Sequence, residues 1–301
     1  MELWIPITIA AAFLQNLRSA LQKHLKGVMG TYGATFVRFG FGCPIAILIV
    51  AVLHWGVGHT LPAVNTPFLV WMVLGGLGQI AATFLLVHLF SFRNFAVGTA
   101  YSRTEPAQAA LFGLVFLSET VTSGTLIAIA ISVVGVMLIS VAHLEVSVRS
   151  LVSSVFSRTA LIGLASGSMF GFSAVAYRAA SLALGGPNFM MQAAYTLAWT
   201  TLFQTVLMGG WLLLTNRDER RRIGAAWKPS LVVGVAGAFA SFGWFMAMTL
   251  QQAAVVKSLA QIEMLFTFAS TVFVFKEKIN RLEIAGCILI VSGILVLLAV
   301  R

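Results

Sequence analysis

Residues 105–119 read EPAQAALFGLVFLSE, and residues 263–277 read EMLFTFASTVFVFKE. Each stretch begins and ends with glutamate in an otherwise apolar context, and a glycine follows 16 positions after the second glutamate, at Gly135 and at Gly293. A constant offset of 158 residues relates the two sets. Carboxylates are rare in this chain, so their recurrence in register indicates an internal duplication rather than a chance match between apolar segments.

The composition around these stretches is that of a membrane protein. Of the 301 residues, 59% are hydrophobic and 9% are charged, and the mean hydropathy is +0.96, whereas a soluble domain of this length needs more charge to cover its surface. The apolar residues fall in runs of about twenty, long enough for a helix to cross a hydrocarbon core of roughly 30 Å. The sequence therefore predicts an all-α integral membrane protein with ten transmembrane helices, at residues 3–20, 31–53, 68–90, 97–117, 121–142, 160–179, 189–214, 230–250, 254–275 and 281–300.

The duplication divides the ten predicted helices into two repeats of five. Because five is odd, the second repeat must enter the membrane from the side opposite to the first. We expect a first five-helix repeat at residues 1–146, a linker at residues 147–158 and a second, inverted five-helix repeat at residues 159–301. Inverted repeats are a recurring plan of transporters, in which the substrate site lies between the halves near the middle of the membrane.

The basic residues predict the orientation in the membrane. The net charge is +10, but lysine and arginine gather in the breaks between apolar runs rather than on one soluble face. This distribution argues against a nucleic-acid partner and is typical of cytoplasmic loops. Thirteen of these residues lie in the odd-numbered breaks, and only Arg178 lies in the others. We therefore expect a multi-pass protein of the inner (plasma) membrane with both termini on the extracytoplasmic side.

The sequence predicts neither a metal site nor a cofactor. Cys43 and Cys287 lie within apolar runs, and none of the five histidines stands at the spacing of metal ligands. The membrane segments also lack a nucleophile grouped with a base, so an enzyme embedded in the membrane is the weaker interpretation.

Ionisable side chains inside membrane helices are costly to bury and therefore indicate a functional site. Arg103 and Glu105 belong to the fourth predicted helix, and Lys257 and Glu263 belong to the ninth, its counterpart in the second repeat. A cavity between these helices presents both signs of charge, which suits a zwitterion: a cation holds the carboxylate and a glutamate holds the ammonium group. The alternative is that these charged side chains pair with one another.

Four further residues complete the candidate site. Gln79, Tyr101 and Trp244 are polar or aromatic side chains that either line a cavity or pack between helices. Arg38 is a structural or coupling candidate, and an ion pair with Glu105 is one role open to it. The glutamate that closes each duplicated stretch stands at a helix end, where we expect a solvated or capping role rather than a binding one.

Short motifs recur in order along the chain: Phe36-Val37-Arg38-Phe39, Leu89-Phe90-Ser91-Phe92-Arg93, Thr104-Glu105-Pro106, Phe116-Leu117-Ser118-Glu119, Val134-Gly135-Val136, Met246-Ala247-Met248, Phe275-Lys276-Glu277 and Ser292-Gly293-Ile294. In these motifs the chain resembles the EamA-type ten-helix members of the drug/metabolite transporter (DMT) superfamily. The resemblance covers essentially the whole chain and implies two inverted repeats around a central cavity. Members of the family often place both termini in the cytoplasm, opposite to the orientation that the loop charges indicate.

The resemblance also implies a function. Relatives of this kind export amino acids and other metabolites or carry sugars and nucleotide-linked sugars, and this compact chain is most similar to the amino-acid exporters, including the YddG-like group. It therefore implies a non-enzymatic transporter that exports amino acids by alternating access through a central cavity. The alternative within the superfamily is a polyspecific exporter of drugs or lipophilic cations, which needs an aromatic, acidic cavity with no essential cation. The expected partners are a small-molecule substrate and the lipid bilayer, and a monomer is expected because two fused halves enclose a complete pathway.

Overall fold

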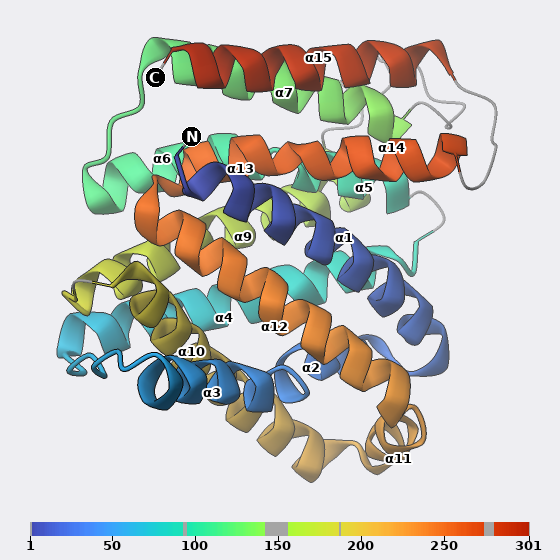
Figure 1. Ribbon diagram of the computed structural model, residues 1–301. Coiled ribbons are helices and arrows are strands. Elements are labelled where there is room, and N and C mark those ends of the chain that lie inside the picture. Colours follow the sequence, from blue (N-terminus) through green and yellow to red (C-terminus); the bar gives the residue numbers. More distant parts are fainter. Residues whose placement is uncertain (1, 93–94, 142–155, 187, 274–279, 301) are drawn as a thin grey trace.

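The computed structural model describes residues 2–92, 95–141, 156–186, 188–273 and 280–300. These residues form helices joined by short connections and no β-strand, so the predicted all-helical class is confirmed for this part of the chain (Figure 1). The first repeat contains α1 (Trp4–Val28), α2 (Thr31–Gly40), α3 (Cys43–Ala51), η1 (Val52–Gly56), α4 (Thr66–Leu89), α5 (Phe95–Ser102), α6 (Glu105–Leu117) and α7 (Ser123–Val141). The second contains α9 (Arg158–Ala183), α10 (Phe189–Thr215), α11 (Arg217–Ala225), α12 (Trp227–Leu250), α13 (Ala253–Leu259), η2 (Ala260–Ile262), α14 (Glu263–Phe273) and α15 (Arg281–Ala299).

Seven helical segments of the described residues are long and apolar enough to cross a membrane. They are Thr31–Gly56, Thr66–Leu89, Ser123–Ser140, Arg158–Ala183, Phe189–Thr215, Trp227–Leu250 and Arg281–Ala299. The predicted first span, α1, has the length but carries Gln15, Asn16 and Arg18 in its second half, which lowers its hydropathy. The other two predicted spans are interrupted.

The interruptions fall at corresponding places in the fourth and ninth predicted helices. The fourth divides into α5 and α6, and the ninth divides into α13 and α14 with the 3-10 turn η2 between them. Pro106 stands in the first turn of α6. Because proline has no N–H and its ring clashes with the carbonyl group four residues before it, α5 ends at Ser102 and the chain breaks at residues 103–104. The prediction of one continuous helix in each place was therefore wrong. A break within a helix does not change its apolar composition, so composition alone does not predict it.

The fifth helices of the two repeats, α7 and α15, lie side by side at one edge of the molecule (Figure 1). Gly135 of α7 approaches Gly286 of α15, and Gly293 of α15 approaches Ala128 of α7; a Cβ added at Gly135 would lie 2.7 Å from the Gly286 carbonyl oxygen. Residue numbers therefore rise along one helix as they fall along the other. The two equivalent helices are antiparallel, which is the relationship that an inverted repeat requires.

Glycines bring α9 against the interrupted helix of the first repeat. Gly163 packs on the backbone of Gly98, and a Cβ added at Gly167 would lie 2.7 Å from the Ser102 carbonyl oxygen. One turn further, a Cβ at Gly171 would lie 3.2 Å from the Glu105 carbonyl oxygen. A spacing of four residues places these glycines on one face, and the absence of side chains lets the two backbones touch.

The equivalent contact region, between α1 and the interrupted helix α13–α14 of the second repeat, is not packed in this way. We call these two contact regions the α9 seam and the α1 seam. The positions 158 residues before these glycines are Ile5, Ile9 and Phe13 of α1. Phe13 meets Phe266 of α14 edge to face, with 5.9 Å between the ring centroids. Side chains of this size prevent close approach of the backbones, so the α1 seam is wider than the α9 seam.

The repeat boundaries at residues 146 and 159 stay a prediction. Most of the predicted linker at residues 147–158 lies outside the described residues, as does Glu277. Within the described part, Ser157 caps α9 by accepting a hydrogen bond from the Ala160 N–H at 3.3 Å, so the second repeat has a defined helical start.

Candidate functional site

A cavity of about 360 Å³ lies between the two halves. Its lining comes from α1, α2, α4 and the α5–α6 break of the first half, and from α9, α12 and the α13–α14 break of the second. This volume is near the lower end of the ~300–1,000 Å³ found for small-molecule sites. The cavity therefore has room for a small metabolite.

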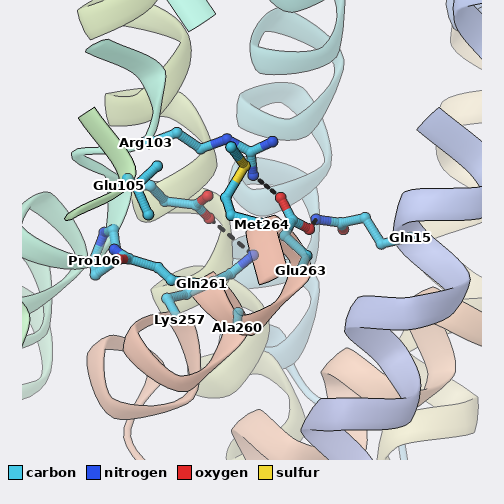
Figure 2. A pocket seen from close by; sticks show the side chains of 10 residues that line it. Gln15, Arg103, Glu105, Pro106, Lys257, Ala260, Gln261, Glu263 and Met264 are labelled. Atoms are coloured by element: carbon cyan, nitrogen blue, oxygen red, sulfur yellow. Dashed lines mark hydrogen bonds and ion pairs between the residues drawn. The ribbon is translucent and has the colours of Figure 1, made fainter. Parts of the chain in front are cut away.

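The residues at the two helix breaks form ion pairs that cross from one half to the other. Lys257 Nζ lies 2.8 Å from Glu105 Oε1, and the Arg103 guanidinium pairs with Glu263. Figure 2 shows the two pairs close together. The residues of both pairs line a smaller space of about 20 Å³, large enough for about one water. The four predicted residues thus come together, and they pair with one another as the alternative from the sequence proposed.

The two glutamates occupy equivalent positions, but their cations do not. Glu105 and Glu263 are 158 residues apart, whereas the positions equivalent to Arg103 and Lys257 hold Gln261 and Thr99. Each half therefore supplies its carboxylate from the same position of the repeat, whereas the cations come from different positions of the repeat. The repeat alone does not predict this exchange of partners.

Trp244 belongs to the same network. Its Nε1 donates to Gln15 Oε1 at 2.9 Å, and Gln15 Nε2 donates to Glu263 Oε2 at 3.0 Å. Lys257 Nζ lies 4.8 Å from the centroid of the Trp244 ring, within the range of a cation–π contact. These contacts fix the indole ring at the wall of the cavity and connect α1 to both ion pairs.

Gln79 lines the cavity on α4 and is held by a second network. Tyr177 donates to Gln79 Oε1 at 3.0 Å, and Gln204 Nε2 donates to the same oxygen at 3.1 Å. Tyr177 is a lining residue that the sequence did not single out. Tyr101, in contrast, is buried within α5 and is not part of the lining.

Arg38 lies in the cavity wall but does not pair with Glu105, so that sequence-based pairing was wrong. Its Nη1 donates to Thr83 Oγ1 at 2.9 Å, while Glu105 is engaged by Lys257. Arg18 of α1 also lines the cavity and was missed by the sequence analysis. The signal was present, because Arg18 is a charge within an apolar run, but its position near the lysines of the first break concealed it.

Arg178 lies beside the cavity, next to the lining residue Tyr177 and bonded to the lining residue Met248. The sequence placed it in a break, but it lies within α9, where its Nε donates to Glu119 Oε1 at 2.6 Å. Its Nη1 donates to the carbonyl oxygens of Met248 at 2.6 Å and Gln251 at 2.8 Å. The expectation of a solvated or capping role was therefore wrong for Glu119. Ser118, at φ = 53°, ends α6 just before this carboxylate.

No metal-binding cluster is found in the described part of the chain. Among these residues, no three histidine, cysteine, aspartate or glutamate side chains gather closely enough to hold an ion. Cys43 and Cys287 are free thiols.

The sequence matches the profile of the EamA-like transporter family over residues 2–141 and again over residues 157–299. The chain belongs to the EamA-like transporter family. Because one family profile matches twice, the duplication read from the glutamates and glycines is confirmed. The protein is a multi-pass membrane transporter of small molecules.

A solved crystal structure has the same fold as this transporter. It is titled only "Crystal structure of protein" and is 18% identical, with a TM-score of 0.72 over 99% of this chain and 96% of that chain. At this identity the likeness concerns the fold alone. No curated protein sequence matches the transporter.

Proposed function

We propose that this transporter exports amino acids by alternating access through the cavity between its halves. The observation that carries the proposal is the crossing of two ion pairs, Lys257–Glu105 and Arg103–Glu263, at the two helix breaks. An amino acid carries one group of each sign, so its ammonium group competes for the glutamates as its carboxylate competes for the cations. Substrate binding then exchanges contacts between the halves for contacts to the substrate.

The interrupted helices support a substrate site at the depth of the two ion pairs. Transporters commonly place their substrate where two discontinuous helices of inverted repeats meet, because the free backbone groups and charges there are shielded from lipid. In our proposal the chain has ten spans in two inverted five-helix repeats. Seven are the long apolar helices, one is α1, and the last two are the α5–α6 and α13–α14 pairs.

The asymmetry of the cavity indicates the side from which the described state is reached. The lining extends from the breaks towards Ala20 of α1 and Phe90 at the end of α4, whereas Arg178 and Glu119 join helices at the opposite end. The break after Ala20 carries Lys23 and Lys26, and the break after Phe90 carries Arg93. Because basic residues are typical of cytoplasmic loops, in our proposal the open end faces the cytoplasm and both termini lie on the extracytoplasmic side of the inner membrane. The state described by the structure then loads substrate from the cytoplasm.

Exchange between two states follows from the unequal seams. The α9 seam is lined by glycines and tightly packed, whereas the α1 seam is separated by larger side chains such as Phe13 and Phe266. Rocking the halves about the α7–α15 contact narrows one seam as it widens the other, which is the movement that alternating access requires.

The rival within the family is an exporter of drugs or lipophilic cations. Aromatic residues in the lining, such as Trp244 and Phe245, favour it. The charges oppose it, because Arg18, Arg38, Arg103 and Lys257 outnumber the two carboxylates in the same lining. An excess of positive charge repels a cation.

Counterflow in proteoliposomes tests the proposal. We expect uptake of labelled amino acids into vesicles preloaded with the same amino acid and no uptake of tetraphenylphosphonium. Glu105→Gln and Lys257→Met should each lower uptake by at least about tenfold, whereas Arg217→Gln, an exposed arginine of α11, should leave it unchanged. The proposal is abandoned if both neutral variants, normally inserted, transport amino acids at the wild-type rate.

A further inference from the structure

We propose that Arg18 and Arg38 form a subsite for substrate carboxylates, and that this subsite makes the transporter prefer acidic amino acids to their neutral amides. The inference rests on the proposed function and narrows its substrate class. It assigns anion binding to residues outside the two ion pairs at the helix breaks.

The two arginines lie together in the cavity wall and are almost completely buried. Arg18 of α1 is 4% exposed and Arg38 of α2 is 6% exposed, and both line the cavity. Their aliphatic stems flank Gly237 of α12: a Cβ added there would lie 3.3 Å from Cδ of Arg18 and 3.6 Å from Cγ of Arg38. The glycine therefore makes room for both side chains at one place.

Neither guanidinium has a carboxylate partner among the described residues. Arg38 Nη1 donates to the Thr83 hydroxyl, and Arg18 Nη2 makes a 3.4 Å contact with the Ser19 hydroxyl. Arg18 Nε is buried and has no acceptor in the described part of the chain. The ion pairs formed by the described residues include neither arginine.

The carboxylates of the cavity are already engaged. Glu105 pairs with Lys257, and Glu263 pairs with Arg103 and accepts from Gln15. These two pairs are neutral overall, so among the described residues Arg18 and Arg38 add two positive charges to the cavity that no carboxylate compensates. Because the two like charges also repel each other, this arrangement is costly inside a membrane protein without an anion to neutralise it.

The donor geometry selects the chemistry of that anion. A guanidinium group presents parallel N–H donors that match the two oxygens of a carboxylate, and a buried, charge-assisted pair of this kind is strong. In the proposed function the α-carboxylate competes for the cations of the helix breaks, Lys257 and Arg103, so a second carboxylate is needed to reach Arg18 and Arg38. Glutamate and aspartate supply two, whereas glutamine and asparagine, which have nearly the same size and shape, supply one.

The test compares these isosteric pairs by counterflow in proteoliposomes. For the wild-type transporter we expect the uptake of glutamate to exceed that of glutamine, and the uptake of aspartate to exceed that of asparagine, by about tenfold or more. Arg18→Gln and Arg38→Gln should bring both ratios close to one. Arg18→Lys should give an intermediate ratio because it keeps the positive charge and loses the parallel N–H donors. Arg217→Gln, an exposed arginine on α11, is the matched control and should keep the wild-type ratios.

Thermal unfolding of the purified transporter separates binding from a structural role. A subsite with uncompensated charge predicts that Arg18→Met keeps or raises the Tm of the ligand-free protein while abolishing the rise in Tm that glutamate causes. A structural role predicts a lower Tm for the same variant. If a variant fails to fold, the wild-type protein still tests the subsite, because glutamate should raise its Tm more than glutamine at equal concentration.

The outcomes distinguish this inference from the proposed function. Equal use of glutamate and glutamine by the wild type and by Arg18→Gln overturns the subsite and leaves amino-acid transport standing. Stabilisation by succinate that depends on Arg18, without transport of any amino acid, supports the subsite and overturns the proposed function. Stabilisation by glycerol phosphate but by neither glutamate nor succinate overturns the assignment to carboxylates.

Discussion

Arg178 on α9 connects three helices at one end of the cavity through a single guanidinium group. It pairs with Glu119, which follows α6, and donates to the carbonyl oxygens of Met248 and Gln251 at the end of α12. The equivalent position in the first repeat, 158 residues earlier, is Ala20. In the proposed function, the Arg178–Glu119 pair is the contact that we expect to hold one end of the cavity closed while the other end is open.

Weakening that pair should open the closed end. In Glu119→Gln the charge attraction is lost, and we expect a cysteine placed at Met248 to react several-fold faster with a membrane-impermeant maleimide added from the Glu119 side. The background for this measurement is a transporter in which Cys43 and Cys287 are replaced by serine, since both are free thiols. The pair has no gating role if labelling of this cysteine is the same with and without Glu119→Gln.

The crossed ion pairs should be energetically coupled. We expect Lys257→Met to lower thermal stability because it leaves Glu105 mostly buried without its cation, and we expect Glu105→Gln combined with Lys257→Met to recover part of the loss. A double-mutant cycle on the purified protein should give a coupling free energy of about 1–3 kcal/mol. Additive effects of the two substitutions would show that the pair contributes nothing beyond its separate members.

The glycines of α9 should be needed for the closed seam. Gly167→Ala places a methyl group 2.7 Å from the Ser102 carbonyl oxygen, and overpacking of this kind costs about 1–3 kcal/mol. Gly210→Ala on α10 is the matched control, because no atom outside its own helix lies within 4 Å of the added Cβ. Denaturation monitored by tryptophan fluorescence should show a lower midpoint for Gly167→Ala alone, and equal midpoints would contradict tight packing at the seam.

The loop charges predict which side of the membrane holds each end of the chain. A reporter that works only outside the cytoplasm should be active when it is fused after Arg301. A reporter that works only in the cytoplasm should be active when it is inserted at Arg221. Paired alkaline phosphatase and green fluorescent protein fusions in cells make this measurement. A cytoplasmic signal at Arg301 would reverse the orientation, and with it the direction in which the open cavity faces.

Several features of the fold followed from the sequence because they depend on local residue identity. Twenty-residue apolar runs lower the free energy of a helix in lipid wherever they occur, so the all-helical membrane class needed no tertiary information. The duplication was visible because Glu105, Gly135 and their counterparts recur at one offset. The helix break before Pro106 was missed, since hydropathy averages over positions and does not weigh one missing N–H group.

The sequence by itself determined the membrane class, the two related halves and most of the charged residues that line the cavity. Only the tertiary structure decided how those charges are partnered: Glu105 with Lys257, Glu119 with Arg178, and no carboxylate for Arg18 or Arg38 among the described residues. The physical reason is that ion pairing depends on distances of a few ångströms between helices far apart in the chain. A repeat relates equivalent positions within the two halves, but it does not specify which face of each helix meets its neighbour.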